Sequence, residues 1–353
     1  MEFGICVSTK IDETGFVSHV ENLGYSHAWI TDSQMIFSEC YAALALIAQR
    51  TRTIKIGTGV AVAGLRLAPV TANAIATIAR LAPGRTFLGI GTGNSAWHLM
   101  GNKPLPMAEF GEYLRVVRAL LAGERVDFTV HGRTAPIQFL LTDYRFLELG
   151  YPIPIYVSAF GPKAQALAGQ YGDGVVISIP RVARLEDALV HVREGAARAR
   201  RRLDDFYSCA LATVAVLDQG EPANSERIVR ECGPSIMAGV HYLYEKLHKS
   251  GAEPPAWVRP IWKPFCQLME KAPPGLLHFT LHGSHYTYLP PEEARLITAE
   301  MVRATCIAGQ ADEVIERIRE LERQGLKQLM FLPPVEHQYR MVEDFSHKIL
   351  RRL

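Results

Sequence analysis

The stretch LGIGTGNSAWH, residues 88–98, places alternating glycines and then polar side chains at the end of an apolar run. Gly89 and Gly91 resemble the start of a G-x-G-x-x-G loop, which binds a dinucleotide pyrophosphate, but Asn94 stands where the third glycine is required. The stretch also lies at the fourth expected strand rather than the first. We therefore expect small residues that let barrel layers pack and, at the strand end, let a flat ligand approach the backbone.

The same pattern occurs one strand earlier, in IKIGTGVAV (54–62), where Thr58 and Gly59 lie at the corresponding level. Two adjacent strands that end in Gly-Thr-Gly predict a shared flat surface at one end of a sheet.

A third segment, SAFGPKAQALAG (158–169), has the composition of an anion site. A strand ends at Ser158, and Gly161 and Pro162 then open a helix. Proline suits the first helical turn, and the free N–H groups of that turn favour a phosphate or carboxylate. Lys163 adds a positive charge. An ordinary strand-to-helix turn explains this stretch equally well.

Two ionisable residues follow expected strands. Asp32 is a candidate catalytic group, although a helix N-cap is an equally good account of it. His98 is a candidate proton donor or phosphate contact, and the alternative is a helix-cap or surface histidine.

A histidine-rich segment, residues 276–291, carries His278, His282 and His285. On a helix the three side chains would share a face, as metal ligands do, but Gly283 and Ser284 favour a strand or loop, and no acidic or cysteine ligand is near in sequence. We therefore predict no metal site. Two roles stay open, a lid that contacts substrate and a structural cluster, together with the nearby aromatic side chains of Trp257, Trp262 and Phe265.

The elements that position these residues alternate between strand and helix. Strands are expected at 2–8, 27–32, 54–62, 85–93, 154–159, 174–180, 206–217 and 326–334. Helices are expected at 16–24, 40–50, 70–81, 107–123, 162–172, 185–203, 225–239 and 339–353. The strands are almost continuously apolar, as in a parallel sheet buried on both faces. Eight such units predict a (β/α)₈ barrel rather than an open sheet.

Two segments interrupt the alternation within a barrel domain expected to span 1–353. Residues 124–152 predict a short β-rich insertion with a turn near Gly132. Residues 240–309, between the seventh and eighth units, predict a larger insertion that serves as a lid, because long excursions from a compact barrel are usually functional.

Composition limits the partners of the chain. A formal net charge of +2 gives no reason to expect nucleic acid or an acidic membrane as a partner. The six cysteines form no C-x-x-C pair, which favours reduced thiols in a cytoplasmic protein. The N-terminal sequence has the pattern of a strand, so no signal peptide or membrane span is expected.

Taken together, residues 54–94, 108–124 and 154–176 resemble the bacterial luciferase-like superfamily, in particular its methylenetetrahydromethanopterin reductase branch. The resemblance covers the first 180 residues and the last 45, and residues 240–300 match nothing in it. It implies a barrel that binds a flavin or the deazaflavin coenzyme F420 at its C-terminal mouth.

The resemblance also assigns roles to single residues. It implies a cis peptide at Gly59–Val60 against the ring, with Asp32 as the ionisable group nearby. The remaining cofactor contacts that it implies are Thr58, Thr92 and Asn94 along the ring and polyol chain, Ser158, Gly161, Pro162 and Lys163 at the phosphate, and Ser178 on the opposite side of the ring.

The function that the resemblance implies is hydride transfer between coenzyme F420 and a small organic substrate, with Asp32 and His98 as catalytic candidates. The alternative is a monooxygenase that uses reduced FMN and a partner flavin reductase, and a minor one is a non-catalytic flavin-binding protein. Many members of this superfamily are homodimers through early-barrel helices, here 40–50 and 70–81.

Overall fold

The structure is a computed structural model that describes residues 1–179, 185–248 and 250–353. The chain divides into two compact units. The first comprises residues 1–210 and 325–329, and the second comprises residues 211–324 and 330–353.

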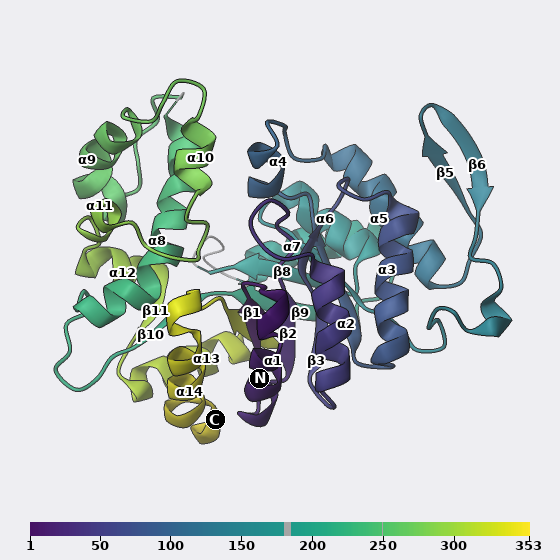
Figure 1. Ribbon diagram of the computed structural model, residues 1–353, viewed down its shortest axis with the longest axis horizontal. Coiled ribbons are helices and arrows are strands. Elements are labelled where there is room, and N and C mark those ends of the chain that lie inside the picture. The colour runs from purple at the N-terminus through teal and green to yellow at the C-terminus, as the bar shows by residue number, and fades with distance from the viewer. Residues whose placement is uncertain (180–184, 249) are drawn as a thin grey trace. The chain divides into compact units, whose positions relative to one another are not determined.

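Eight strands close into a barrel in the order β1-β12-β9-β8-β7-β4-β3-β2 (Figure 1). These strands are β1 (Glu2–Val7), β2 (His27–Ile30), β3 (Lys55–Val62), β4 (Thr86–Gly91), β7 (Ile155–Ser158), β8 (Gly174–Ser178), β9 (Tyr207–Leu211) and β12 (Gln328–Phe331). The predicted (β/α)₈ barrel is confirmed. The expected strand 174–180 ends at Ser178, and Pro180 lies outside the described residues.

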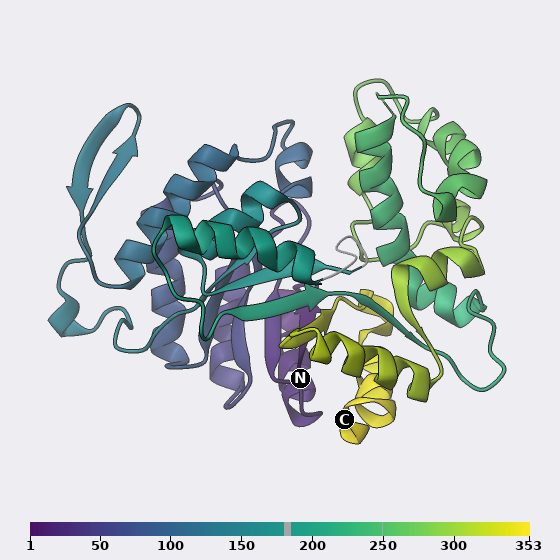
Figure 2. The ribbon, with the colours of Figure 1, turned by 180° about the vertical axis from the view of Figure 1, so that it is seen from behind.

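The helices of the first unit follow the expected strand-then-helix order (Figure 2). They are α1 (Gly15–Asn22), α2 (Cys40–Arg50), α3 (Ala68–Leu81), α4 (Ser95–Leu99), α5 (Met107–Leu121), α6 (Pro162–Tyr171) and α7 (Leu185–Arg198). Helices α6 and α7 approach backbone to backbone. A Cβ on Gly169 would lie 1.9 Å from the Val192 carbonyl oxygen, and one on Gly195 would lie 1.8 Å from that of Ala166.

Aromatic rings fill part of the barrel interior and explain two of its glycines. The rings of Trp29 and Phe87 lie 4.4 Å apart between centroids. A Cβ on Gly57 would lie 2.2 Å from the Phe87 carbonyl oxygen, and one on Gly89 would lie 2.8 Å from the Trp29 ring. These two glycines therefore make room for neighbouring strands and rings, and Gly91 lies closer to the strand end.

The predicted β-rich insertion is confirmed as a hairpin of β5 (Val126–Val130) and β6 (Arg133–Ile137). His131 and Gly132 connect the strands with φ values of 51° and 74°. Positive φ at both central positions suits the twist of a two-residue hairpin. The hairpin stands apart from the barrel strands in both views (Figures 1 and 2).

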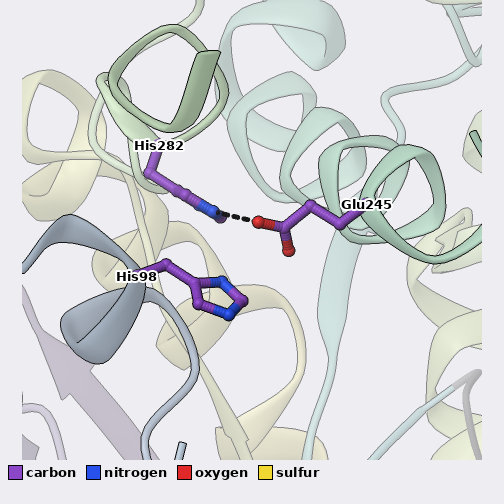
Figure 3. A group of neighbouring side chains, drawn as sticks. All are labelled: His98, Glu245 and His282. Carbon is purple, nitrogen blue, oxygen red and sulfur yellow. Dashed lines mark hydrogen bonds and ion pairs between the residues drawn. The ribbon is translucent and has the colours of Figure 1, made fainter. Parts of the chain in front are cut away.

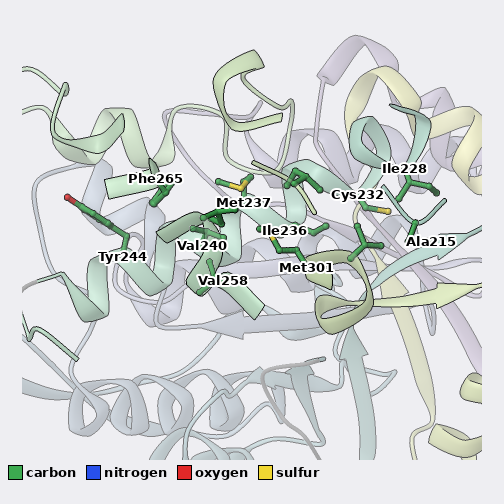
Figure 4. Packing of buried hydrophobic residues seen from close by; sticks show 14 of the residues in the cluster. Ala215, Ile228, Cys232, Ile236, Met237, Val240, Tyr244, Val258, Phe265 and Met301 are labelled. Carbon is green, nitrogen blue, oxygen red and sulfur yellow. The ribbon is translucent and has the colours of Figure 1, made fainter. Parts of the chain in front are cut away.

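The second unit is a helical body on a two-stranded parallel sheet of β10 (Thr213–Val216) and β11 (Cys306–Gly309). Its helices are α8 (Glu226–Leu247), α9 (Arg259–Met269), α10 (Leu277–His282), α11 (Pro291–Ala294), α12 (Ala299–Thr305), α13 (Ala311–Arg323) and α14 (Gln338–Lys348). Figure 4 shows its core, in which Ile236, Val240, Phe265 and Met301 are buried together.

Three sequence predictions after residue 205 are wrong in detail. The expected strand 206–217 divides at Ala212 into β9 of the barrel and β10 outside it. Helix α8 runs past Gly239 to Leu247, because the apolar series that includes Val240 and Tyr244 continues on the core side. Residues 277–282 are helical because Leu281 is anchored in the same core, and Gly283 follows the end of that helix.

No described helix is long and apolar enough to span a bilayer. All six cysteines are free thiols, and Cys6, Cys40, Cys209 and Cys232 are buried.

Candidate functional site

The carboxyl ends of β3, β4 and β7 bring predicted site residues together at one mouth of the barrel. A Cβ added to Gly91 would lie 3.1 Å from the Cβ of Ser158 and 3.4 Å from the Cγ2 of Val60. The side chains of Val60 and Ser158 therefore close in on Gly91, where a larger residue would crowd them. Val60 and Ser158 are half-buried, so they border open space.

A bulge places Val60 at this mouth. The pairing of β3 with β4 moves from Thr58–Leu88 to Ala61–Ile90, so β3 contains one extra residue there. The peptide Gly59–Val60 within the bulge is cis, as predicted. A Cβ on Gly59 would lie 2.5 Å from that of Trp29, so only glycine fits beside the Trp29 side chain.

Thr58 does not border the mouth, contrary to the role implied by the resemblance. Its side chain has no exposed surface, and its hydroxyl donates a 2.6 Å hydrogen bond to the carbonyl oxygen of Gly89. Alternation along β3 is the physical reason, because Gly57 faces the interior rings and the next residue points the opposite way. Thr58 therefore joins β3 to β4 from outside the barrel.

The polar residues after β4 lie at the same end of the barrel. Thr92 is half-buried and Asn94 is exposed, and Gly93 between them has a φ of 66°. Asn94 precedes α4, and its carbonyl oxygen accepts a hydrogen bond from the N–H of His98. His98 lies inside this short helix and is half-buried, so it is not a cap.

The turn after β7 forms the helix start that the sequence predicts. Gly161 is the N-cap of α6, Pro162 is its first residue, and no side chain caps this end. Lys163 is exposed in the first turn. The first-turn N–H groups and the helix dipole favour an anion here.

Ser178 lies at the end of β8, next to β7. Ser158 pairs with Val176, and Ser178 follows two residues later on the same face of the strand. Ser158 and Ser178 therefore present hydroxyls to the same side of the sheet, and both are half-buried.

Asp32 is a buried carboxylate held by Arg66. Its Oδ2 lies 2.7 Å from Nη1 of Arg66 and its Oδ1 lies 3.1 Å from Nη2. Oδ2 also accepts a 3.2 Å hydrogen bond from the N–H of Val62, just after the bulge. The helix-cap account of Asp32 is wrong, because Glu39 caps α2.

Arg66 is further held from its other side. Its Nη2 lies 2.8 Å from Glu39, and its guanidinium carbon lies 4.9 Å from the centroid of the Tyr41 ring. Burial opposes the charge of the guanidinium, but the hydrogen bonds and charge of Asp32 outweigh it and raise the pKa of Arg66 above its ordinary value. Sequence reasoning missed Arg66 because 34 residues separate it from Asp32.

Two histidines of the second unit pair with carboxylates, one of them in the histidine-rich segment. Nε2 of His282 lies 2.7 Å from Oε1 of Glu245 (Figure 3), and Nε2 of His241 lies 2.9 Å from Oε1 of Glu293. Burial, together with the charges of His282 and His241 nearby, lowers the pKa of His285 to about 4. The acidic partners that sequence reasoning did not find come from α8 and α11.

The three aromatic residues near the histidine-rich segment, Trp257, Trp262 and Phe265, all belong to the helical core or pack against it. Phe265 is fully buried, and Trp257 and Trp262 pack against the same cluster. Their positions are those of packing residues.

Comparison with known proteins places the chain among established enzymes. Residues 1–328 match the family model of the luciferase-like monooxygenases. The chain is 29% identical over 326 residues to the 5,10-methylenetetrahydromethanopterin reductase of Archaeoglobus fulgidus, which covers 91% of this chain and 89% of that protein. It is 29% identical over 325 residues to the F420-dependent glucose-6-phosphate dehydrogenase of Beutenbergia cavernae, covering 88% and 81%.

A solved structure shares the fold along nearly the whole chain. The coenzyme F420-dependent tetrahydromethanopterin reductase of Methanopyrus kandleri superposes with a TM-score of 0.72 and 21% identity, covering 99% of both chains.

Proposed function

Since the chain belongs to the luciferase-like monooxygenase family, we propose that it is an oxidoreductase that transfers hydride between the deazaflavin coenzyme F420 and a small organic substrate. Support comes from the two relatives that are 29% identical along more than four fifths of their own length, one of which is named as F420-dependent. The structural observation that carries the proposal is the convergence of Val60, Gly91 and Ser158 at the carboxyl ends of the neighbouring strands β3, β4 and β7.

The residues at the mouth fit a flat ring. A side chain at position 91 would push against Val60 and Ser158 and displace them, so the glycine keeps the strand ends thin where a ring would lie. When bound, the deazaflavin ring accepts or gives up the hydride, while the protein orients it against the substrate. Thr92 and Asn94 lie just beyond β4, where they would contact the ring or its polyol chain.

The start of α6 is the proposed phosphate site. Gly161 and Pro162 leave the first-turn N–H groups without a side-chain cap, and Lys163 supplies a full positive charge beside them. Ser158 offers a hydroxyl group from the adjacent strand end, and Ser178 at the end of β8 would face the ring from its other side. Backbone donors, helix dipole and ammonium group together match a phosphate.

In this proposal Asp32 holds the backbone beside the ring site in place and does not itself transfer a proton. It accepts the N–H of Val62 and pairs with Arg66, so it fixes the backbone just after the bulge that carries Val60. His98, half-buried in α4, stays the predicted proton donor.

We further propose that the protein forms a homodimer in a reducing compartment. Helices α2 and α3 expose large apolar side chains, which are Leu46, Val70 and Leu81. Six free thiols fit a reducing compartment.

Cofactor titration tests the function. Purified protein is titrated separately with F420 and with FMN, and reduction of bound F420 is followed by its absorbance. The expected result is F420 binding that Gly91→Val weakens at least tenfold, whereas Gly239→Ala, at a helical position with open space around it, leaves affinity unchanged. Tight FMN binding without F420 binding would overturn the proposal.

A further inference from the structure

The first unit contains a pocket of about 570 Å³ at the amino ends of its strands, which we name the base pocket. Ile155 and Tyr207, the first residues of β7 and β9, line this pocket, and so does Leu121 at the end of α5. The strands of a (β/α)₈ barrel all run in one direction, so the base pocket lies at the opposite end from the mouth at Ser158. Its volume falls within the range of small-molecule pockets, about 300–1,000 Å³.

Most of the wall of the base pocket is apolar or aromatic. Leu149, Pro152 and Ile153 come from the segment before β7, and Tyr151 adds a ring that is 53% exposed. Such walls suit the carbon skeleton of an organic molecule.

The hydroxyl of Tyr156 is a polar group in this wall. Tyr156 lines the pocket and is only 7% exposed. Its ring is held by the rings of Tyr207 and Phe87, whose centroids lie 5.1 Å and 5.4 Å away. Within the described part of the chain no residue makes a hydrogen bond with this hydroxyl. Because buried tyrosine hydroxyls usually have a partner, this one is available to a polar group of a ligand.

The charges in the wall determine the sign of the ligand. Oδ1 of Asp173 lies 2.9 Å from Nη1 of Arg118, so these two residues neutralise each other. Arg201 also contacts Asp173 but does not line the pocket. Asp205 lines the pocket, is exposed, and has no ion-pair partner among residues 1–179, 185–248 and 250–353. Its carboxylate is therefore the unpaired charge that the pocket presents, and it favours a cation.

We propose that the base pocket binds an organic amine. Its ammonium group pairs with Asp205, a second polar group meets the Tyr156 hydroxyl, and its apolar body lies against the wall around Leu149 and Pro152. One free carboxylate and one hydroxyl are too few oxygen ligands for a Ca²⁺ site, which takes six to eight. The base pocket is independent of the function proposed for the mouth.

Nuclear magnetic resonance of the full-length protein with ¹³C-labelled isoleucine methyl groups tests the site. Ile153 and Ile155 line the pocket and report binding there, whereas Ile47 on α2 does not line it. The protein is titrated with tyramine, which carries an ammonium group, a ring and a hydroxyl. A parallel titration uses 4-hydroxyphenylacetate, which has the same ring and hydroxyl but a carboxylate in place of the ammonium group.

The expected result is a saturable shift of the Ile153 and Ile155 signals with tyramine and none with the carboxylate compound. Loss of one charged or one neutral hydrogen bond should weaken tyramine binding about fivefold or more in Asp205→Asn and about two- to tenfold in Tyr156→Phe. Asp204→Asn is the matched control and should bind as wild type, because Asp204 is exposed, pairs with Arg202 and does not line the pocket.

A space-filling variant, Ala122→Trp, should abolish binding, because Ala122 lines the pocket and is exposed. Circular dichroism reports the fold of each variant, and the near-isosteric Asp205→Asn and Tyr156→Phe decide the matter if Ala122→Trp does not fold. Absence of saturable tyramine binding at Ile153 and Ile155, equal binding of the two compounds, or full affinity in Asp205→Asn or Tyr156→Phe would overturn the inference.

Discussion

Replacement of Arg66 by Met should destabilise the barrel far more than loss of an ordinary surface ion pair. The Asp32 side chain is only 3% exposed and that of Arg66 is 21% exposed. Met keeps the aliphatic part of the side chain but leaves the Asp32 carboxylate buried without its partner cation. Removing one member of a buried pair costs about 3–5 kcal/mol, because an uncompensated charge stays in the interior.

The Arg115–Glu112 pair on α5 is the matched control. Its side chains are 37% and 50% exposed, and the two residues are three apart on one helix. Exposed pairs contribute about 0.2–1 kcal/mol, so Arg115→Met should change stability little. A difference of about 3 kcal/mol between the two variants is therefore expected.

Thermal unfolding followed by circular dichroism measures this difference. In a unit of this size each kcal/mol shifts the midpoint by about 2–4 °C, so Arg66→Met should unfold at least 6 °C below wild type. The double variant Asp32→Asn with Arg66→Met should recover part of the loss, because no charge is then left unpaired. Arg66→Met unfolding within about 4 °C of wild type would refute the role of this pair, since exposed pairs shift the midpoint by no more than about that.

Three further predictions follow from single contacts. Thr58→Val should lose about 1 kcal/mol of stability with its hydrogen bond to Gly89 while F420 affinity stays constant, and a selective loss of affinity would contradict the buried position of Thr58. Gly195→Ala should cost about 3 kcal/mol or more in thermal unfolding, because its Cβ would lie 1.8 Å from the Ala166 carbonyl oxygen. The pKa of His285 is about 4 in the folded protein and about 6.5 in the unfolded chain, so the unfolded chain binds a proton first as pH falls. The folded protein therefore loses stability between pH 6.5 and pH 4. His285→Asn should remove up to about 3 kcal/mol of this pH dependence, measured as urea midpoints across that range, and an unchanged slope would exclude His285 as its source.

Periodicity predicted most of the barrel because its strands and helices are separate local patterns. The strand 154–159 and the helix 40–50, for example, are each long enough to be predicted without knowing their neighbours. Predictions failed where tertiary contacts outweigh local signals. The expected helix 225–239 ends at Gly239, yet α8 continues to Leu247 because Val240 and Tyr244 extend its buried stripe.

The second wrong prediction concerns the direction of a side chain and not the position of a strand. Thr58 belongs to the predicted strand and stands beside the predicted cis peptide, yet its side chain points out of the barrel. A strand of period two fixes only which residues share a face, and it does not say which of the two faces turns toward the barrel interior. Sequence spacing alone therefore identified the site segment but not every side chain that faces it.

Long-range partners are the part of the site that no local pattern contains. Arg66 pairs with Asp32 from 34 residues away, and Glu245 pairs with His282 from 37. In each case the sequence offered a conspicuous polar residue without its partner, and the apparent chemistry changed once the partner was known. From the sequence, Asp32 is predicted to be a catalytic group. In the structure, its contacts hold the backbone next to the β3 bulge. A carboxylate already held by two guanidinium hydrogen bonds and a backbone N–H has little capacity left to transfer a proton, so proton transfer falls to His98 in the proposed mechanism.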